Sequence, residues 1–161
     1  MSSLVSMAEV VGALLKERGE TVAIAESSTG GLISAALLAV PGASTYFVGG
    51  GVIYTQSARK TLLDIDLHAN PGMRPSTEPY AHLLASTSRE RLGATWGVGE
   101  TGAAGPSGNR YGDQPGHSCI AVNGPKTRAI TVETGQSDRE ENMWQFARDA
   151  LALLEEILHA R

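Results

Sequence analysis

A cluster of hydroxyl and glycine residues occurs at Ala25–Gly31, which reads Ala-Glu-Ser-Ser-Thr-Gly-Gly. It follows a short β-branched run, Thr21–Ala25, and precedes a longer apolar segment, Leu32–Val40. This order predicts a strand, a turn and a helix. Hydroxyl groups and unpaired backbone N–H groups then lie together at a helix N-terminus, where negative charge is stabilised. We expect this turn to form the centre of an active site; the alternative interpretation is that one of its hydroxyls only caps the helix.

Two further glycine-bearing turns, Gly49–Arg59 and Thr101–Pro106, accompany predicted strands. Ligands bind beyond the carboxyl ends of strands in α/β sheets, so turns at that edge are the expected place for chemistry. A hydroxyl nucleophile there needs a base, and it needs N–H donors for the oxyanion that develops. The helix N-terminus after Thr29 is predicted to supply those donors.

Several other kinds of site are excluded by spacing. None of the four histidines is at ligand spacing from another histidine or from Cys119, so no metal site is predicted. The P-loop pattern Gly-x-x-x-x-Gly-Lys-Ser/Thr and the hydrolase elbow Gly-x-Ser-x-Gly do not occur. The nearest approach to a dinucleotide fingerprint, Gly97-Val98-Gly99, lies inside a predicted strand. No cofactor is therefore predicted.

The length of the chain indicates a single domain, and its charge argues against two classes of partner. Its 161 residues suit one domain with a substantial core. The net charge of −4 and the lack of a basic block argue against a nucleic-acid or membrane-surface partner. No apolar run is long enough to span a bilayer, and Met1–Val11 lacks the pattern of a signal peptide. The single cysteine, Cys119, can form no internal disulfide, which favours a cytoplasmic location.

Helices and strands alternate early in the chain and a hairpin comes late. This order predicts an α/β fold, a single domain over residues 1–161 with a mixed β-sheet covered by helices on its faces. The expected helices are Met7–Arg18 and Ser137 to about His159, each opened by a capping box, with Gly31–Leu38, Gln56–Leu63 and Glu78–Leu92 between them. The expected strands are Thr21–Ala25, Tyr46–Thr55 (interrupted by a bulge or a bare backbone patch at its glycines), Thr95–Thr101, His117–Val122 and Thr127–Glu133.

Three segments together resemble a known family. They are Ala25–Gly31, then Val40–Gly50 with its Val-Pro-Gly-Ala-Ser and Tyr-Phe-Val-Gly-Gly, and then Thr101–Pro106, which reads Thr-Gly-Ala-Ala-Gly-Pro. In this order they look like the C-terminal domain of the CinA (competence/damage-inducible) family, whose best-understood members are nicotinamide mononucleotide deamidases. The likeness covers nearly the whole chain.

The resemblance implies an α/β fold and a metal-free amidohydrolase that converts nicotinamide mononucleotide to nicotinate mononucleotide and ammonia. Matched residue by residue, it makes Ser27 the nucleophile and assigns Tyr54 and Thr101 to the site. Arg139 matches the arginine of the family's Gly-Asp-Arg segment, which implies a contact with the substrate phosphate or an interface. The two turns contribute the other expected substrate-binding residues: Thr29, Gly30, Gly102 and Gly105.

The family segment Tyr-Ser-Asn-x-x-Lys differs in this chain, where it reads Tyr54-Thr55-Gln56-Ser57-Ala58-Arg59. The family lysine is the expected base, and an arginine remains protonated in proteins, so Arg59 cannot accept a proton from the serine. Lys60 replaces that lysine only if the helix turns by about 100° or slips by one residue. The expected base is therefore Lys60 or a water molecule, and Arg59 is expected to hold an anionic group of the substrate.

Three functions are open at this point. The preferred hypothesis is an amidohydrolase that acts on a small pyridine nucleotide, and the alternative is a nucleotide-binding module without turnover, motivated by Arg59. A purely structural subunit has no feature in its favour beyond the long closing helix. That helix carries apolar residues around much of its circumference, which predicts a homo-oligomer, with a dimer favoured. They are Trp144, Phe146, Leu151, Leu153 and Ile157.

Overall fold

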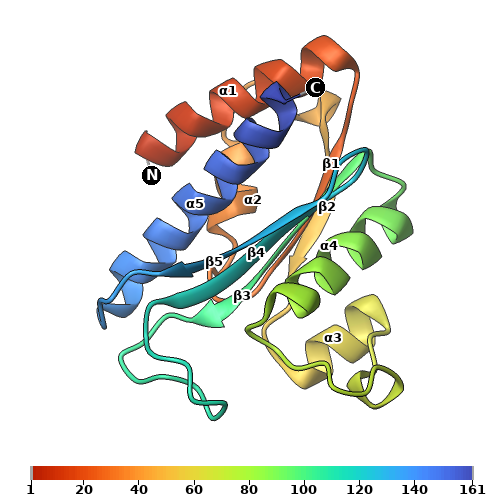
Figure 1. The fold of residues 1–161 in the computed structure, drawn as a ribbon. Helices are drawn as coiled ribbons and strands as arrows, with labels where there is room; N and C mark the ends of the chain where they lie inside the picture. Colours follow the sequence, from red (N-terminus) through yellow and green to blue (C-terminus); the bar gives the residue numbers. More distant parts are fainter. Residues whose placement is uncertain (1, 161) are drawn as a thin grey trace.

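A computed structural model describes residues 2–160, which form one five-stranded sheet in the order β2-β1-β3-β4-β5 (Figure 1). The central strand pairs β1–β2 and β1–β3 are parallel, and the β3–β4 and β4–β5 pairs are antiparallel. The predicted α/β fold with a mixed sheet is confirmed. The strands are β1 (Val22–Glu26), β2 (Phe47–Val52), β3 (Trp96–Ala103), β4 (His117–Asn123) and β5 (Arg128–Glu133).

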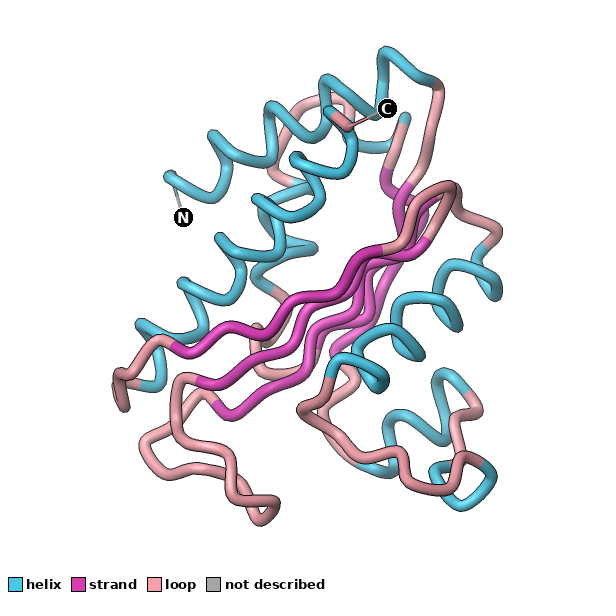
Figure 2. Tube along the Cα trace, viewed as in Figure 1, coloured by secondary structure: helices cyan, strands magenta, loops and turns pink. Residues whose placement is uncertain are grey.

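Helices cover both faces of this sheet. The helices α1, α2 and α5 lie on one face and α4 lies on the other, with α3 beside α4 (Figures 1 and 2). The carboxyl ends of the three parallel strands meet at one edge, where the loops that hold the predicted site begin. The helices are α1 (Ser2–Arg18), α2 (Leu32–Leu38), α3 (Gln56–Leu63), α4 (Glu78–Leu92) and α5 (Arg139–His159), with 3-10 turns η1 (Ala43–Thr45) and η2 (Leu67–Ala69).

Large and small residues alternate along the central strands and are sorted by face. Trp96 and Val98 of β3 point into the large core under α1, α2 and α5. Gly97 and Gly99 point to the opposite face and let α4 approach closely. A Cβ atom on Gly99 would lie 2.1 Å from the carbonyl oxygen of Ala81 in α4. The glycines of β3 therefore set the distance between the sheet and α4.

Two middle helices match their predicted spans because local capping groups define them. The Thr55 hydroxyl accepts the N–H of Ala58 at the start of α3, and the Thr77 hydroxyl accepts the N–H of Tyr80 at the start of α4. At the end of α4, Gly93 adopts the left-handed conformation that ends a helix.

The first and last helices correct two capping predictions. α1 begins at Ser2, so the predicted start at Met7 is wrong and Ser6 lies inside the helix. The N-cap of α5 is Asp138, whose carboxylate accepts the N–H of Glu141 at 3.0 Å, and not Ser137. In both cases a serine with a glutamate three residues later also occurs near a helix start without capping it.

The irregularity expected in the second strand precedes its glycines. The register of β2 against β1 shifts between Val22 and Ala23, whose partners are Phe47 and Gly49. Val48 is therefore the extra residue, and the three glycines that follow pair regularly with β1.

The apolar circumference of α5 is used within the chain. Phe146, Leu151, Leu153 and Ile157 are buried, and Trp144 is half-buried against the same core. The homo-oligomer stays a prediction. No helix within residues 2–160 combines the length and the apolar character needed to cross a membrane.

We predict that Gly99→Ala destabilises the fold by about 1–3 kcal/mol, because its methyl group would overlap the Ala81 carbonyl and push α4 away from the sheet. Gly49→Ala is the matched control, since its Cβ would meet only the end of the Leu92 side chain, at 3.4 Å. Urea denaturation of both variants measures the difference in unfolding free energy. Equal stability of the two variants would show that α4 does not need the bare backbone of β3.

His117 joins β4 to β5 and to the segment before α4. Its Nδ1 lies 2.5 Å from Oε1 of Glu133, its Nε2 lies 2.8 Å from the carbonyl oxygen of Ser76, and Asp113 is 3.7 Å from Nε2. Both ring nitrogens face acceptors, so only the doubly protonated ring donates to both. Burial lowers the pKa of His117, but the hydrogen bonds and carboxylates raise it above its ordinary value overall.

We therefore predict that protonated His117 stabilises the fold. Because its pKa is higher in the folded chain than the unfolded value of about 6.5, this stabilisation is complete below that pH and is lost as the pH rises through the folded-state pKa. The unfolding free energy of the wild type minus that of His117→Gln should therefore fall as the pH rises above about 6.5, as measured by urea denaturation. His82→Gln is the control, because His82 makes no ion pair within residues 4–160. A difference for His117 that stays constant with pH would contradict the prediction.

Candidate active site

The turn Ser27–Gly31 connects β1 to α2 at the carboxyl edge of the parallel strands. Two glycines close it, with φ angles of 63° at Gly30 and 100° at Gly31, which residues other than glycine rarely adopt. A Cβ atom on Gly30 would also lie 2.8 Å from Cε of Met143 in α5. The backbone conformation therefore favours glycine at both positions, and the contact with Met143 also favours it at position 30.

Glu26, the last residue of β1, caps α2 with its carboxylate. The side chain is fully buried. Its five donors are the N–H groups of Gly31, Ile33 and Ser34, at 2.9–3.1 Å, and the hydroxyls of Ser34 and Thr29, both at 2.7 Å. An anion of the chain itself already occupies the N-terminus of α2. This helix end is therefore not free to serve as the oxyanion donor that the sequence predicts.

Glu100 is a second fully buried carboxyl group, beside Glu26. Ile24 pairs with Val98 in the parallel register, which places the two glutamates next in line on the same face of the sheet. Burial raises the pKa of Glu100, against the lowering effect of its hydrogen bonds. Its donors are the N–H groups of Ser27 (3.1 Å) and Thr29 (2.9 Å) and the hydroxyls of Thr29 (2.9 Å), Ser118 (2.8 Å) and Ser28.

The sequence analysis did not single out Glu100, although a signal exists. Trp96, Val98 and Glu100 are alternate residues of one strand, and the first two point into the core. A charged residue that continues such an inward series is rarely buried without partners. The partners are residues 27–29 and 118, which are distant from Glu100 in the chain. The alternation in β3 therefore predicts that Glu100 is buried, but it does not predict what Glu100 contacts.

The two serines of the turn differ in what they contact. Ser28 is 6% exposed, its hydroxyl donates to Oε2 of Glu100, and it lines a small pocket. Ser27 is half-buried, and its N–H donates to Glu100. Its hydroxyl has no hydrogen-bond partner within residues 2–160. The family resemblance assigns Ser27 as nucleophile, whereas Ser28 is the serine in contact with a carboxyl group.

The pocket beside Ser28 has a volume of about 200 Å³, and we call it the glycine pocket. It is also lined by residues 102–105, by the loop residues 107–109, and by Tyr54 and Arg139. Arg139 donates from Nη1 to the carbonyl oxygen of Gly105 at 2.6 Å and from Nη2 to the Tyr54 hydroxyl at 3.0 Å. The structure thus brings together Tyr54, Gly102, Gly105 and Arg139, four of the residues expected in the site, around one pocket.

Three other predicted substrate-binding residues do not line this pocket. Thr101 is buried, and its hydroxyl accepts the N–H of Ser76 at 3.0 Å. Thr29 is fully buried between the two glutamates. Gly30 is exposed, and its N–H donates to the carbonyl oxygen of Ser27. In the structure these residues shape the turns around the pocket.

Arg59 and Lys60 line a separate hollow of about 450 Å³. Nζ of Lys60 lies 2.7 Å from Oδ1 of Asp64, and this hydrogen bond raises the pKa of Lys60. The guanidinium group of Arg59 lies 5.8 Å from the centre of the Tyr80 ring. Neither side chain lines the glycine pocket, so the lysine expected as the base is paired elsewhere and remains protonated.

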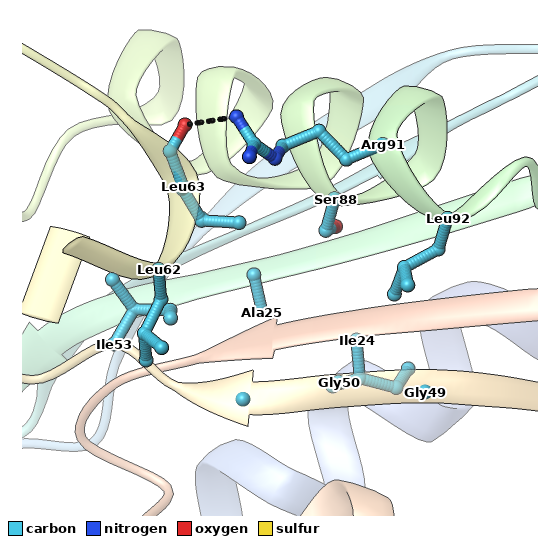
Figure 3. Close-up of a pocket in the computed structure, with 11 residues that line it drawn as sticks. Ile24, Ala25, Gly49, Gly50, Ile53, Leu62, Leu63, Ser88, Arg91 and Leu92 are labelled. Carbon is cyan, nitrogen blue, oxygen red and sulfur yellow. Dashed lines mark hydrogen bonds between the residues drawn. The ribbon is translucent and has the colours of Figure 1, made fainter. Parts of the chain in front are cut away.

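An apolar groove of about 400 Å³, larger than the glycine pocket, lies between the edge strand β2 and the helices α3 and α4 (Figure 3). Its two polar side chains, Ser88 and Arg91, both donate to backbone carbonyl oxygens. The groove offers no unengaged nucleophile or base, so the smaller glycine pocket is the better candidate for chemistry. Within the described residues, no group of three or more His, Cys, Asp or Glu side chains is arranged to hold a metal ion.

Residues 4–158 match the family model described as the CinA C-terminal domain. A CinA-like protein from Anaeromyxobacter sp. (strain K) is 40% identical over 91% of this chain and 36% of its own length. A CinA-like protein from Prochlorococcus marinus (strain MIT 9313) is 43% identical over 74% of this chain and 28% of its own length. The chain therefore spans about a third of the length of these curated relatives.

Solved structures agree with this match. A CinA superfamily protein from Klebsiella pneumoniae 700603 has a TM-score of 0.91, with 24% identity over 98% of this chain and 99% of that one, and this likeness shows the fold. A competence/damage-inducible protein from Agrobacterium tumefaciens has a TM-score of 0.88, with 26% identity over 97% and 95% of the two chains. Because the model of the CinA C-terminal domain covers nearly the whole of the described fold, including both turns of the candidate site, this chain belongs to the CinA family.

Proposed function

We propose that this chain is a metal-free amidohydrolase of the cytoplasm that hydrolyses the carboxamide of nicotinamide mononucleotide to nicotinate mononucleotide and ammonia. Membership of the CinA family supports the reaction class, because the family resemblance implies it. The observation that carries the proposal is the contact of the serine-bearing turn with a pocket that Tyr54 and Arg139 close. A hydroxyl of the turn attacks the carboxamide carbon, and the resemblance assigns this attack to Ser27.

The pocket volume supports a substrate that enters with one end only. Sites for whole small molecules measure roughly 300–1,000 Å³, and the glycine pocket measures about 200 Å³. It suits the aromatic carboxamide, and the phosphate then lies outside. Tyr54 and Asn109 line the glycine pocket, while Gln56 and Arg110 line the hollow of Arg59. The two hollows are therefore lined by residues that are close together in the chain. A phosphate between them has Arg59 and Arg110 within the same groove to bind it.

We predict ammonia release when the purified chain is incubated with nicotinamide mononucleotide. Arg139→Ala should lower kcat/KM by about 10- to 100-fold, because the guanidinium group holds Tyr54 and Gly105 in place around the pocket. Arg128→Ala, which removes a surface ion pair with Glu156 on the far part of the sheet, is the control. The absence of ammonia above the level of the enzyme-free reaction would rule out the proposed activity.

A nucleotide-binding module without turnover is the second candidate, and the position of Lys60 favours it. The residue expected to act as base is paired with Asp64, while Arg59 is suited to hold a phosphate. In this case calorimetry should detect binding of nicotinamide mononucleotide, and ammonia release should be absent. Arg59→Ala should then weaken this binding, and Arg128→Ala, which lies outside the hollow, should not. Turnover by the unmodified chain would exclude this second function.

A further inference from the structure

We infer that Ser28 is the attacking hydroxyl in this chain and that Glu100 is the group that takes its proton. This inference rests on the proposed amide hydrolysis and deepens it, since it replaces the family's serine and lysine by a different pair of residues. Ser28 lies in the turn that follows β1, and Glu100 lies in the neighbouring strand β3.

The position of Ser28 meets the geometric requirement for a nucleophile. Ser28 lines the glycine pocket, and its hydroxyl donates a hydrogen bond to Oε2 of Glu100. A serine is activated when a base lies within hydrogen-bond distance and a third group orients that base. The N–H groups of Ser27 and Thr29, at 3.1 and 2.9 Å, hold the opposite oxygen of Glu100 in place. The arrangement therefore has a nucleophile, a base and groups that orient the base.

The hydrogen bonds around Glu100 allow it to gain a proton. The Ser118 hydroxyl donates to Oε2 of Glu100 at 2.8 Å, and the carbonyl oxygen of Thr101 lies 3.4 Å from the same hydroxyl as a second acceptor. The Thr29 hydroxyl lies 2.9 Å from Oε1 of Glu100 and 2.7 Å from Oε1 of Glu26. Both hydroxyls can therefore turn to another acceptor when Glu100 is protonated, and no buried donor is left without a partner.

Glu26, the neighbouring carboxylate, does not have this freedom. Three of its five donors are backbone N–H groups at the start of α2, which cannot turn away. It also has no contact with the glycine pocket. Of the two buried carboxyl groups, Glu100 is thus the one connected to a reacting hydroxyl.

The steps balance without a further reagent. Ser28 Oγ forms a bond to the carboxamide carbon while its proton moves to Glu100, and the carbonyl π electrons move to the oxygen. Glu100 then returns the proton to the nitrogen, and the C–N bond breaks to release ammonia and an ester on Ser28. Water attacks the ester while Glu100 takes its proton, and that proton goes to Ser28 Oγ as the C–O bond breaks.

Four variants test the pair by ammonia release from nicotinamide mononucleotide. Ser28→Ala and Glu100→Gln should each lower kcat by at least about 100-fold, since general base catalysis and a covalent nucleophile contribute factors of that size. Ser27→Ala should lower it by less than about tenfold. Ser34→Ala, which removes a hydroxyl donor from Glu26 instead, is the matched control and should leave kcat within about twofold. Thermal unfolding of each variant shows whether it is folded.

The pH profile separates catalysis from a structural role of the network. The acidic limb of kcat/KM should report the ionisation of Glu100, with Glu26 as the other titratable group that contacts the network through Thr29. Ser118→Ala removes a donor that favours the ionised form, so the limb should move to higher pH. In Glu100→Gln the limb should be absent from any residual activity. An unchanged limb in both variants would overturn the assignment of Glu100.

A fluorophosphonate reagent tests the pair independently of the substrate, because Ser28 Oγ would displace its fluoride while Glu100 takes the proton. Mass spectrometry of the wild type should locate the adduct on Ser28, and Glu100→Gln should prevent it. If the wild type releases no ammonia but Ser28 is labelled, the proposed substrate is wrong and the pair stands. An adduct on Ser27, no adduct at all, or loss of activity in Ser27→Ala with Ser28→Ala fully active would overturn the pair while leaving amide hydrolysis possible.

Discussion

Two carboxyl groups buried side by side, Glu26 of β1 and Glu100 of β3, determine the shape of the turn between β1 and α2. Removing a charged group from water costs several kcal/mol unless hydrogen bonds compensate it. Nine donors surround the two groups, and all of them except the Ser118 hydroxyl belong to residues 27–34. The turn must therefore keep the conformation that satisfies both carboxyl groups. The Thr29 hydroxyl lies within hydrogen-bond distance of both carboxyl groups and is shared between them, which couples the two groups to each other.

This constraint explains why adjacent serines have different surroundings. The N–H of Ser27 and the N–H of Thr29 both point to Oε1 of Glu100, so the backbone of residues 27–29 curls around that carboxyl group. The side chain of Ser28 then reaches the other oxygen, at the edge of the glycine pocket, while the Ser27 side chain is left outside the network. A turn shaped only by the helix N-terminus would not distinguish the two hydroxyls.

The sequence predicts those parts of the fold that depend on neighbours in the chain. Helices α3 and α4 match because Thr55, Thr77 and Gly93 act on residues three or four places away. The start of α1 does not match, because a Ser-x-x-Glu spacing inside a helix has the same letters as a capping box. In the site, Tyr54 and Arg139 could be placed through the family segments. The contact of Glu100 with the turn spans more than 70 residues, so it follows only from the register of β1 and β3.

The same register bears on how a CinA domain can change its base and keep its fold. A lysine base must first lose its proton, and the pairing of Lys60 with Asp64 favours the protonated form. A carboxyl group ionises at a much lower pH than a lysine, and burial raises the pKa of Glu100, which increases its affinity for a proton from a hydroxyl. Because position 100 faces the turn from the strand next to β1, an ionisable residue there meets the serines without any change in the backbone. A single inward position of β3 is thus sufficient to place a carboxyl group in contact with the turn.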